Sequence, residues 1–318
     1  GYKIIMLMPD EDGYPDYEAF KNAVSERTAA FITANPEDTG VFNPRVKQFT
    51  DLVHEKGGLC GYDQANANGL LGVARAKEAG FDICFFNLHK TFSAPHGCGG
   101  PASGALGVVE KLVDFLPKPL VDFDGEKYFL NYDVKKSIGK VRSFQGVPQV
   151  VLKSYAWIMS LGAEGLYEVA KVAVLNNNYL FKKLLEHKGV DAPYTEGQQR
   201  VEQVRYTLEK LTKDTGITSE DVSRRVMDFG MHYWTSHHPY YVPEPITLEP
   251  TESPSKEDID EYIATLKHIF DEAYENPEVI KTAPLNSTIH RIDESSFDNP
   301  DEWAITWRAY LKKTKKND

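Results

Sequence analysis

Short apolar runs alternate with stretches of helical periodicity through the first third of the chain, and this alternation restricts the fold more than any other feature. The apolar runs predict strands over residues 28–35, 58–64, 82–88 and 104–110. The spacing of apolar residues between them predicts helices over 16–26, 43–57 and 70–80, the second with Asn43 as N-cap and Pro44 at its first position. Strands that are apolar almost throughout are covered on both faces, so the pattern predicts an α/β fold with a parallel or mixed sheet.

The rest of the chain changes character twice. A stretch rich in Asp, Lys and Pro precedes a long helical region over 147–189, and a strand over 202–211 then introduces a smaller α+β part. Two helices are expected to start at Thr218 and Ser255, each followed three residues on by Asp, which is capping-box spacing. The predicted divisions are 1–115 as the C-terminal part of a large domain, 116–189 as a linker with a long interdomain helical region, and 190–318 as a small C-terminal domain.

Composition excludes some classes of function. The net charge of -11 argues against a nucleic-acid-binding protein, which needs a basic surface. The chain has three cysteines in 318 residues, at positions 60, 84 and 98. So few cysteines, in an odd number, indicate reduced thiols and predict a cytoplasmic location. No apolar run is long enough for a membrane span. The chain opens in the apolar, strand-like run 2–10, and we expect it to be N-terminally incomplete.

Two polar residues stand where predicted strands end. Asp63 closes one apolar run, and Lys90 follows the next. In open α/β sheets, ligands bind at the carboxyl ends of strands. A partly desolvated lysine amine can attack an aldehyde, and pyridoxal phosphate (PLP) needs such a lysine together with a carboxylate that keeps its pyridine nitrogen protonated. The pair therefore predicts a PLP site, the simpler alternatives being a surface lysine and a turn aspartate.

The loop after Lys90 carries further polar groups. His89 and His96 flank the lysine and could contact a cofactor or a substrate, or could be hydrogen-bonded loop residues. Together with Cys98 they do not match the usual zinc spacings, and the adjacent pair His237 and His238 would point in opposite directions, so no metal is predicted. Glycines in 97–102 formally match a dinucleotide fingerprint, but the motif neither leaves a strand directly nor opens a helix.

Four segments resemble one family of PLP enzymes. "YDQANANGLLGVARAKEAGFDICFFNLHK" and "FNLHKTFSAPHGCGGPASGALGV" are similar to the PLP-lysine region of glycine decarboxylase, the P-protein of the glycine cleavage system. "LGAEGLYEVAKVAVLNNNYL" and "LEPTESPSKEDID" match the same family downstream. The spacing is most similar to subunit 2 of the two-subunit prokaryotic type. The resemblance implies PLP-dependent transferase fold type I: a large domain with a mainly parallel sheet plus a smaller C-terminal α+β domain.

The resemblance also implies site residues and a reaction. Lys90 matches the Schiff-base lysine and Asp63 the partner of the pyridine nitrogen. His89 and Thr91 lie beside the lysine in the family motif, Thr91 towards the phosphate, and Asn35 matches a turn of the cofactor site. The implied catalytic residues are thus Lys90, Asp63 and His89.

The implied reaction is decarboxylation of glycine with transfer of the aminomethyl group to the lipoyl arm of H-protein. The implied assembly is a heterotetramer with homologous subunit 1. Two positions depart from the family: Glu202-Gln203 replaces a His-Glu pair, and Leu285 replaces a His. The alternatives are another fold type I enzyme, such as an amino-acid decarboxylase or aminotransferase, and a non-catalytic partner subunit.

Overall fold

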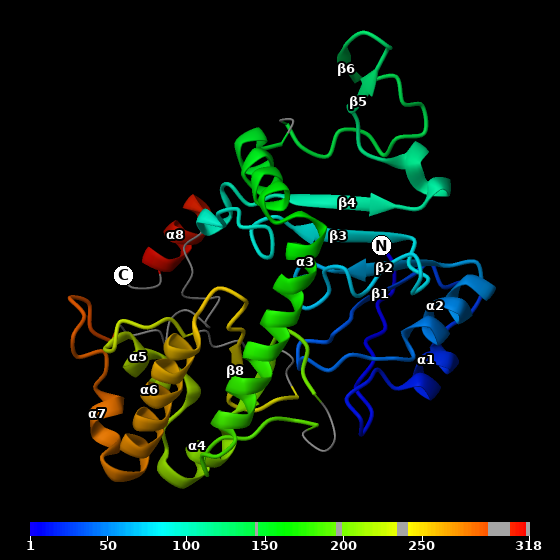
Figure 1. The fold of residues 1–318 in the computed structure, drawn as a ribbon. Helices are drawn as coiled ribbons and strands as arrows, with labels where there is room; N and C mark the ends of the chain where they lie inside the picture. Colours follow the sequence, from blue (N-terminus) through cyan, green and yellow to red (C-terminus); the bar gives the residue numbers. More distant parts are fainter. Residues whose placement is uncertain (144–145, 195–198, 234–240, 292–305, 316–318) are drawn as a thin grey trace.

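The N-terminal part of the chain is built on a four-stranded mixed sheet. The computed structural model describes residues 1–143, 146–194, 199–233, 241–291 and 306–315. The strands, in spatial as well as chain order, are β1 (Ala30–Ala34), β2 (Leu59–Asp63), β3 (Ile83–Asn87) and β4 (Gly104–Val108). The first three are parallel and β4 runs antiparallel to β3 (Figure 1). The predicted strands and the mixed sheet are confirmed.

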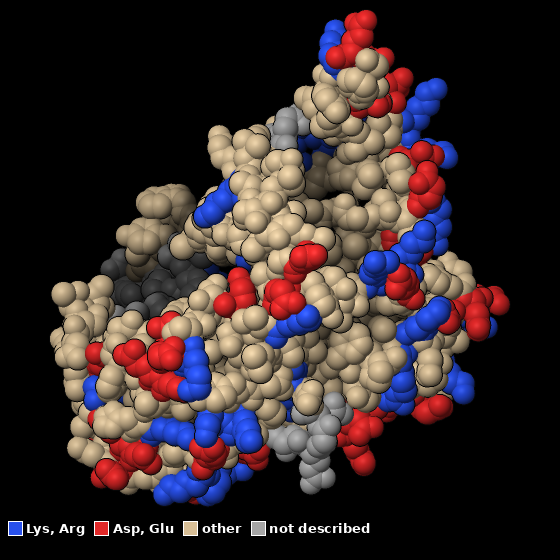
Figure 2. All heavy atoms as spheres, viewed as in Figure 1, with Lys and Arg blue, Asp and Glu red and all other residues tan. Residues whose placement is uncertain are grey.

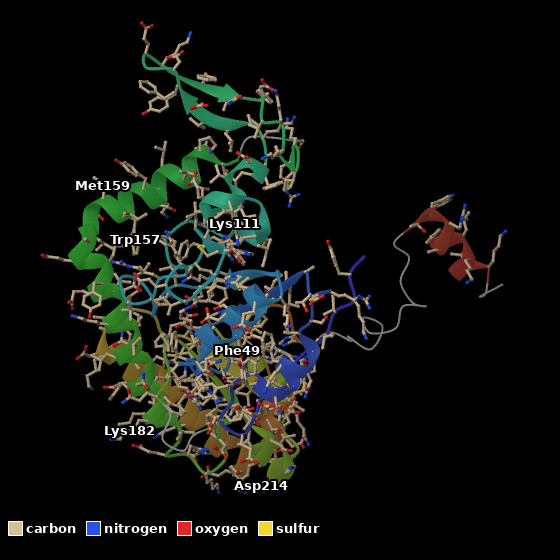
Figure 3. The ribbon with its side chains drawn as sticks, turned by 90° about the vertical axis from the view of Figure 1, so that its right-hand side faces the viewer. Phe49, Lys111, Trp157, Met159, Lys182 and Asp214 are labelled. Atoms are coloured by element: carbon tan, nitrogen blue, oxygen red, sulfur yellow. The ribbon has the colours of Figure 1, made fainter. Side chains whose placement is uncertain are left out.

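One face of this sheet packs against α1 (Tyr17–Ala23) and α2 (Val46–Glu55). Phe49 of α2 lies at the centre of their shared core, in ring contact with Phe20 and Phe31 (Figure 3). The opposite face is only partly covered, because Ile32 of β1 and Leu106 of β4 are exposed. The expectation that both faces are covered is therefore wrong for these two strands within the part of the chain that the structure describes.

Three local predictions are corrected. The expected helix over 70–80 is a series of turns, since Gly72 adopts φ 72°, which breaks a helix. Helix α2 begins at Val46 with Arg45 as N-cap; the side chain of Asn43 instead accepts a hydrogen bond from the backbone N–H of Arg45. The strand-like run 2–10 forms only one isolated bridge, from Pro9 to Pro15.

The segment after β4 contains more structure than a linker. A 3-10 helix, η2 (Glu110–Phe115), leads into an antiparallel hairpin of β5 (Leu120–Phe123) and β6 (Tyr128–Asn131), which projects from the body of the molecule (Figure 1). Short, solvent-exposed strands of this kind lack the continuous apolar pattern of the central sheet, which explains why the sequence predicted a linker here.

Helix α3 (Pro148–Leu184) joins the two halves of the molecule (Figure 1). Its first part contributes Val150, Trp157 and Ile158 to a small core with the loop after β3, and Met159 is exposed (Figure 3). Its last turns pack in the C-terminal core. Between the two parts the helical geometry is interrupted at Gly162, with φ 63° and ψ −175°, a conformation open to glycine almost alone.

The C-terminal part has its own two-stranded sheet, β7 (Val204–Thr207) with antiparallel β8 (Pro245–Leu248). Four helices pack around it in the described residues: α4 (Glu209–Thr215), α5 (Ser219–Met227), α6 (Lys256–Glu275) and α7 (Pro277–Lys281). Helix α8 (Trp307–Thr314) lies apart from this core (Figure 3). The predicted capping boxes are confirmed at Thr218 and Ser255, each reciprocated by the Asp three residues on. Buried aliphatic and aromatic side chains from α3 to α7 surround this sheet.

Two features concern the surface charge and the apolar character of the helices. On the face shown in Figure 2, acidic and basic side chains are interspersed, without the single-sign field of a nucleic-acid-binding surface. None of the helices in the described part of the chain combines the length and apolar character that a membrane crossing requires.

Candidate active site at the carboxyl ends of the parallel strands

Asp63 and Lys90 lie at the same edge of the sheet. Asp63 is the last residue of β2 and pairs in register with Ala34, the last residue of β1, and with Phe85 of β3. Lys90 lies three residues beyond the end of β3, in a turn closed by its backbone N–H to the carbonyl of Asn87, 3.1 Å. Its side chain is exposed and that of Asp63 is half-buried. The parallel register therefore brings a carboxylate and an accessible amine to neighbouring strand ends.

Thr91 connects the lysine turn to the loop after β2. Its side chain is buried, and its Oγ1 accepts a hydrogen bond of 2.9 Å from the backbone N–H of Ala67. The loop itself starts from Asp63, whose Oδ1 accepts from the N–H of Ala65 at 2.9 Å. Thr91 thus fixes the position of Lys90 relative to Asp63, and its hydroxyl hydrogen is left to donate elsewhere.

His89 is held by the glycine-rich loop. Its Nδ1 lies 3.2 Å from the carbonyl oxygen of Ser103, and its ring meets that of His96 edge-on at 4.9 Å between centroids. Cys98 in the same loop is exposed and adopts φ 53° within the 3-10 turn η1 (Gly97–Gly99). The loop therefore folds back along β4 and does not open a helix, as expected for a segment that is not a dinucleotide fingerprint. His237 and His238 lie outside the described residues.

Asn35 has a structural task at the end of β1. Its side chain is buried, accepts from the backbone N–H of Asn43 at 2.7 Å and donates to the carbonyl of the same residue at 3.1 Å. Its own carbonyl accepts from the hydroxyl of Tyr62 on β2. The amide therefore shapes the turn after β1, and its predicted contact with a cofactor stays a prediction.

The C-terminal part adds two carboxyl groups that the Asp63–Lys90 argument does not reveal. Glu202 lies just before β7 and Glu249 just after β8, at the same end of this sheet, where Val204 pairs with Leu248. Oε1 of Glu249 accepts hydrogen bonds from the side-chain amides of Asn66 and Asn68, on the loop after β2. The site therefore has one wall from each half of the chain.

Three consecutive asparagines of α3 hold that second wall in place. Asn178 donates to the carbonyl of Arg200 at 2.6 Å and accepts from its N–H at 3.1 Å. Its side-chain amide thus pairs with the Arg200 backbone as the backbone of a neighbouring β-strand would. Asn177 donates to the carbonyl of Val201 at 3.1 Å, and Asn176 to that of Thr251 at 3.0 Å. Asparagine is a poor helix former, so a run of three inside a helix was the sequence signal for such a role.

A second polar cluster lies at the opposite, amino end of the strands. The carboxylate of Asp82 accepts from the N–H of Cys60 at 2.8 Å and contacts Nε2 of His54 at 2.8 Å and Nζ of Lys111 at 2.6 Å. Ligand atoms of His54, Cys60 and Asp82 lie within 4.8 Å of one another, a spacing that a metal ion could bridge. Burial and the negative charge of Asp82 raise the pKa of the Cys60 thiol to about 12. With the thiol protonated and Lys111 on the carboxylate, the cluster is a structural hydrogen-bond network.

The residues at the carboxyl edge fit PLP. An exposed primary amine suits the aldehyde, and a half-buried carboxylate on the adjacent strand end suits the pyridine nitrogen. Lys90 would hold the cofactor and Asp63 would face its ring, with Thr91 and His89 beside the lysine.

Comparison with known proteins agrees with this reading of the fold. Residues 1–110 match the family model described as "Aminotransferase class-V", and residues 169–289 match "Glycine dehydrogenase, C-terminal domain". The structure superposes on an inhibitor-bound glycine decarboxylase (P-protein) of the glycine cleavage system with a TM-score of 0.70 at 24% identity, over 85% of this chain and 60% of that one. A cysteine desulfurase from Thermococcus onnurineus gives 0.62 at 16% identity, over 85% and 66%. These likenesses show fold type I of the PLP-dependent enzymes.

Sequence similarity reaches along the whole chain. A protein of Pyrococcus horikoshii described as "Probable glycine dehydrogenase (decarboxylating) subunit 2" is 44% identical over 321 residues, which cover 100% of this chain and 63% of the relative. A protein of Thioalkalivibrio sulfidiphilus with the same description is 41% identical over 310 residues, covering 97% of this chain and 62% of the relative. Along its whole length the chain is therefore similar to proteins described as glycine dehydrogenase (decarboxylating) subunit 2, and it spans a little under two thirds of the length of these relatives.

Proposed function

We propose that this chain carries the cofactor-holding lysine of a PLP-dependent glycine dehydrogenase. The reaction is decarboxylation of glycine with transfer of the aminomethyl group to the lipoyl arm of H-protein. One observation carries the proposal: Asp63 and Lys90 lie at the carboxyl ends of adjacent parallel strands in a chain 44% identical to relatives of that description. The second wall, with Glu202 and Glu249, encloses the same edge from the C-terminal half.

Each residue has a role that its position supports. The Lys90 amine is the covalent attachment point for PLP, and Asp63 holds a proton at the pyridine nitrogen. His89, fixed through Nδ1 by the Ser103 carbonyl, presents its ring beside the lysine, and the Thr91 hydroxyl is available to the phosphate. The Asn35 amide acts indirectly, by shaping the turn next to Asp63. When bound, PLP supplies an electron-accepting ring that stabilises the charge left by loss of carbon dioxide.

The proposed partners follow from the same family. The relatives are described as subunit 2, so we propose a homologous subunit 1 as the partner chain and lipoylated H-protein as the acceptor. Free cysteines at positions 60, 84 and 98 accord with the proposed cytoplasmic location.

The test uses the full-length protein together with subunit 1 and PLP. Borohydride reduction followed by peptide mapping is expected to place the pyridoxyl label on Lys90. Lys90→Arg keeps the charge but removes the nucleophile, so the label and glycine-dependent exchange of carbon dioxide with lipoylated H-protein are both expected to disappear. Lys77→Arg, at an exposed lysine of the preceding turn, is the matched control and is expected to behave as wild type.

Two outcomes would contradict the proposal. A label on another lysine would refute the assignment of Lys90. A label on Lys90 without glycine-dependent exchange would favour another fold type I activity, such as an amino-acid decarboxylase or aminotransferase.

A further inference from the structure

Two carboxyl groups from different strands meet the loop that follows β2. Glu249 Oε1 accepts from the amides of Asn66 and Asn68, the first at 2.6 Å. Glu202 Oε2 lies so close to Gly69 of the same loop that an added Cβ there would come within 2.8 Å of it. Both carboxyl groups thus lie against one short segment of the chain, residues 66–69.

The surroundings of the two groups differ. The Glu202 side chain is 3% exposed, and its Oε2 has no hydrogen-bond partner among the residues that the structure describes. Glu249 is half-buried and receives two amide donors on one oxygen. A buried carboxylate without donors is costly, whereas donated hydrogen bonds stabilise the charged form. The negative charge therefore belongs on Glu249 and a proton on Glu202.

Lys90 belongs to the same cluster. Ala67, between the two asparagines, donates its backbone N–H to Oγ1 of Thr91, the residue after Lys90. The Lys90 charge lowers the pKa of both Glu202 and Glu249, so its ammonium lies within electrostatic reach of each carboxyl group.

Electrostatics reinforce the assignment. Burial, and next the charge of Glu249, raise the pKa of Glu202 to about 8, although its own backbone N–H and then the charge of Lys90 act in the opposite sense. Burial also raises the pKa of Glu249; the amides of Asn66 and Asn68 and the charge of Lys90 oppose this, and Glu252 adds to it. Tyr62, whose pKa is raised by burial and by Glu202, also faces the pair and stays protonated.

We propose that Glu202 and Glu249 form a carboxyl pair that carries one proton, on Glu202, and presents a single negative charge to the Lys90 amine. The pair orients the Lys90 side chain and compensates its positive charge. Neither carboxyl group touches the reacting atoms. Above the pH at which Glu202 loses its proton, the pair presents two negative charges to Lys90 instead of one. The link to catalysis rests on the proposed function, but the proton on Glu202 does not.

The proton on Glu202 can be observed directly by infrared difference spectroscopy on the full-length protein without cofactor. Two buried carboxyl groups are expected to give protonated bands near neutral pH: Glu37, whose pKa is raised by burial to about 7, and Glu202, whose band should disappear with a midpoint near pH 8. Glu202→Gln should lack this band, and Glu249→Gln should shift its midpoint downward because the like charge is gone. Glu257→Gln, at an exposed position of α6, is the matched control and should leave the band unchanged.

The effect on Lys90 is measured by trapping its reaction with pyridoxal, using borohydride and peptide mapping. Glu249→Gln removes the negative charge that the pair presents to Lys90, so labelling of Lys90 at pH 7 is expected to rise by about threefold or more. Glu202→Gln replaces a neutral group by a neutral one, so its rate should match wild type at pH 7 and exceed it at pH 9. Thermal unfolding of each variant checks that the fold is kept.

A band with its midpoint near pH 8 that is retained in Glu202→Gln, or equal labelling in Glu249→Gln and Glu257→Gln, would overturn the proposal. Neither measurement uses glycine or H-protein. A protein that gives both expected results and yet fails in glycine exchange therefore retains the carboxyl pair and loses only the proposed function.

Discussion

Replacing Asp82 by Asn tests how far one buried carboxylate holds the N-terminal sheet together. The Asp82 side chain is 5% exposed and joins three elements, through the N–H of Cys60 in β2, Nε2 of His54 in α2 and Nζ of Lys111 in η2. The carbonyl oxygen of Asn can still accept from the N–H of Cys60. Its NH₂ group would instead face His54 or the Lys111 ammonium, and the neutral amide would no longer form an ion pair with Lys111.

The expected loss is about 3 kcal/mol in the free energy of unfolding at pH 7. A hydrogen bond to a charged group contributes about 1.5–3 kcal/mol, and breaking a buried pair costs about 3–5 kcal/mol. The lower end applies because the side chains of His54 and Lys111 are 34% and 57% exposed and regain water when the contact is lost.

The pH dependence gives the prediction its sign. Burial alone would raise the pKa of Asp82, but the contacts with Lys111, His54 and the Cys60 N–H outweigh it, and the pKa lies below its ordinary value. The stabilisation is therefore complete above the ordinary pKa of about 3.9 and is lost as pH falls through the native value. The difference between wild type and Asp82→Asn should be largest near neutral pH and shrink below about pH 4.

Urea unfolding followed by tryptophan fluorescence and circular dichroism, repeated from pH 3 to pH 8, measures this difference. Asp51→Asn is the control, because Asp51 forms an exposed helix pair with Lys47 and its loss should cost no more than about 0.5 kcal/mol. Equal stabilities of the two variants at pH 7, or a difference that grows toward acid pH, would refute the reasoning.

Three other changes test the site and the packing. Asp63→Asn in the full-length protein is expected to retain PLP weakly and lose glycine decarboxylation, measured by absorbance and exchange assays, since an amide cannot hold the pyridine nitrogen protonated; near-normal turnover would make Asp63 a turn residue. Gly40→Ala should cost about 2–5 kcal/mol in chemical unfolding, because Gly40 has φ 83° and a Cβ would meet the Gln203 carbonyl at 1.8 Å. Phe49→Ala should cost about 3–5 kcal/mol by the same assay, whereas Phe42→Ala, at a partly exposed ring, should cost clearly less.

The central strands could be predicted because apolar runs reflect burial directly. The helix expected over 70–80 could not be excluded from periodicity, since the positive φ of Gly72 is not visible in the pattern, nor is its position beside Tyr167 of α3, far along the chain. The N-cap assigned to Asn43 failed because its side chain accepts from the N–H of Arg45, while the Asn35 side chain holds the Asn43 backbone at the end of β1. Such competition between local and tertiary partners is invisible in a single sequence.

The two walls of the site also differ in how far the sequence could predict them. Asp63 and Lys90 could be predicted because strand order and strand ends follow from nearby sequence. Glu202 and Glu249 depend on how the C-terminal half docks on the loop after β2, through Asn66, Asn68 and the asparagines of α3. Glu202 departs from a family motif and Glu249 lies in a segment that matches one, but neither observation predicts where the side chain lies in the structure.

The interruption of α3 at Gly162 has a consequence for how the site can open. The first part of the helix is packed with the loop that follows Lys90, and the last part belongs to the core that carries Glu202 and Glu249. Gly162 lies where an added Cβ would meet nothing within 4 Å, so its dihedral angles can change without a steric clash. A change there alone does not part the two walls, because Glu249 of one wall accepts from Asn66 and Asn68 of the other. Opening of the site therefore requires these hydrogen bonds to break together with a rotation at Gly162.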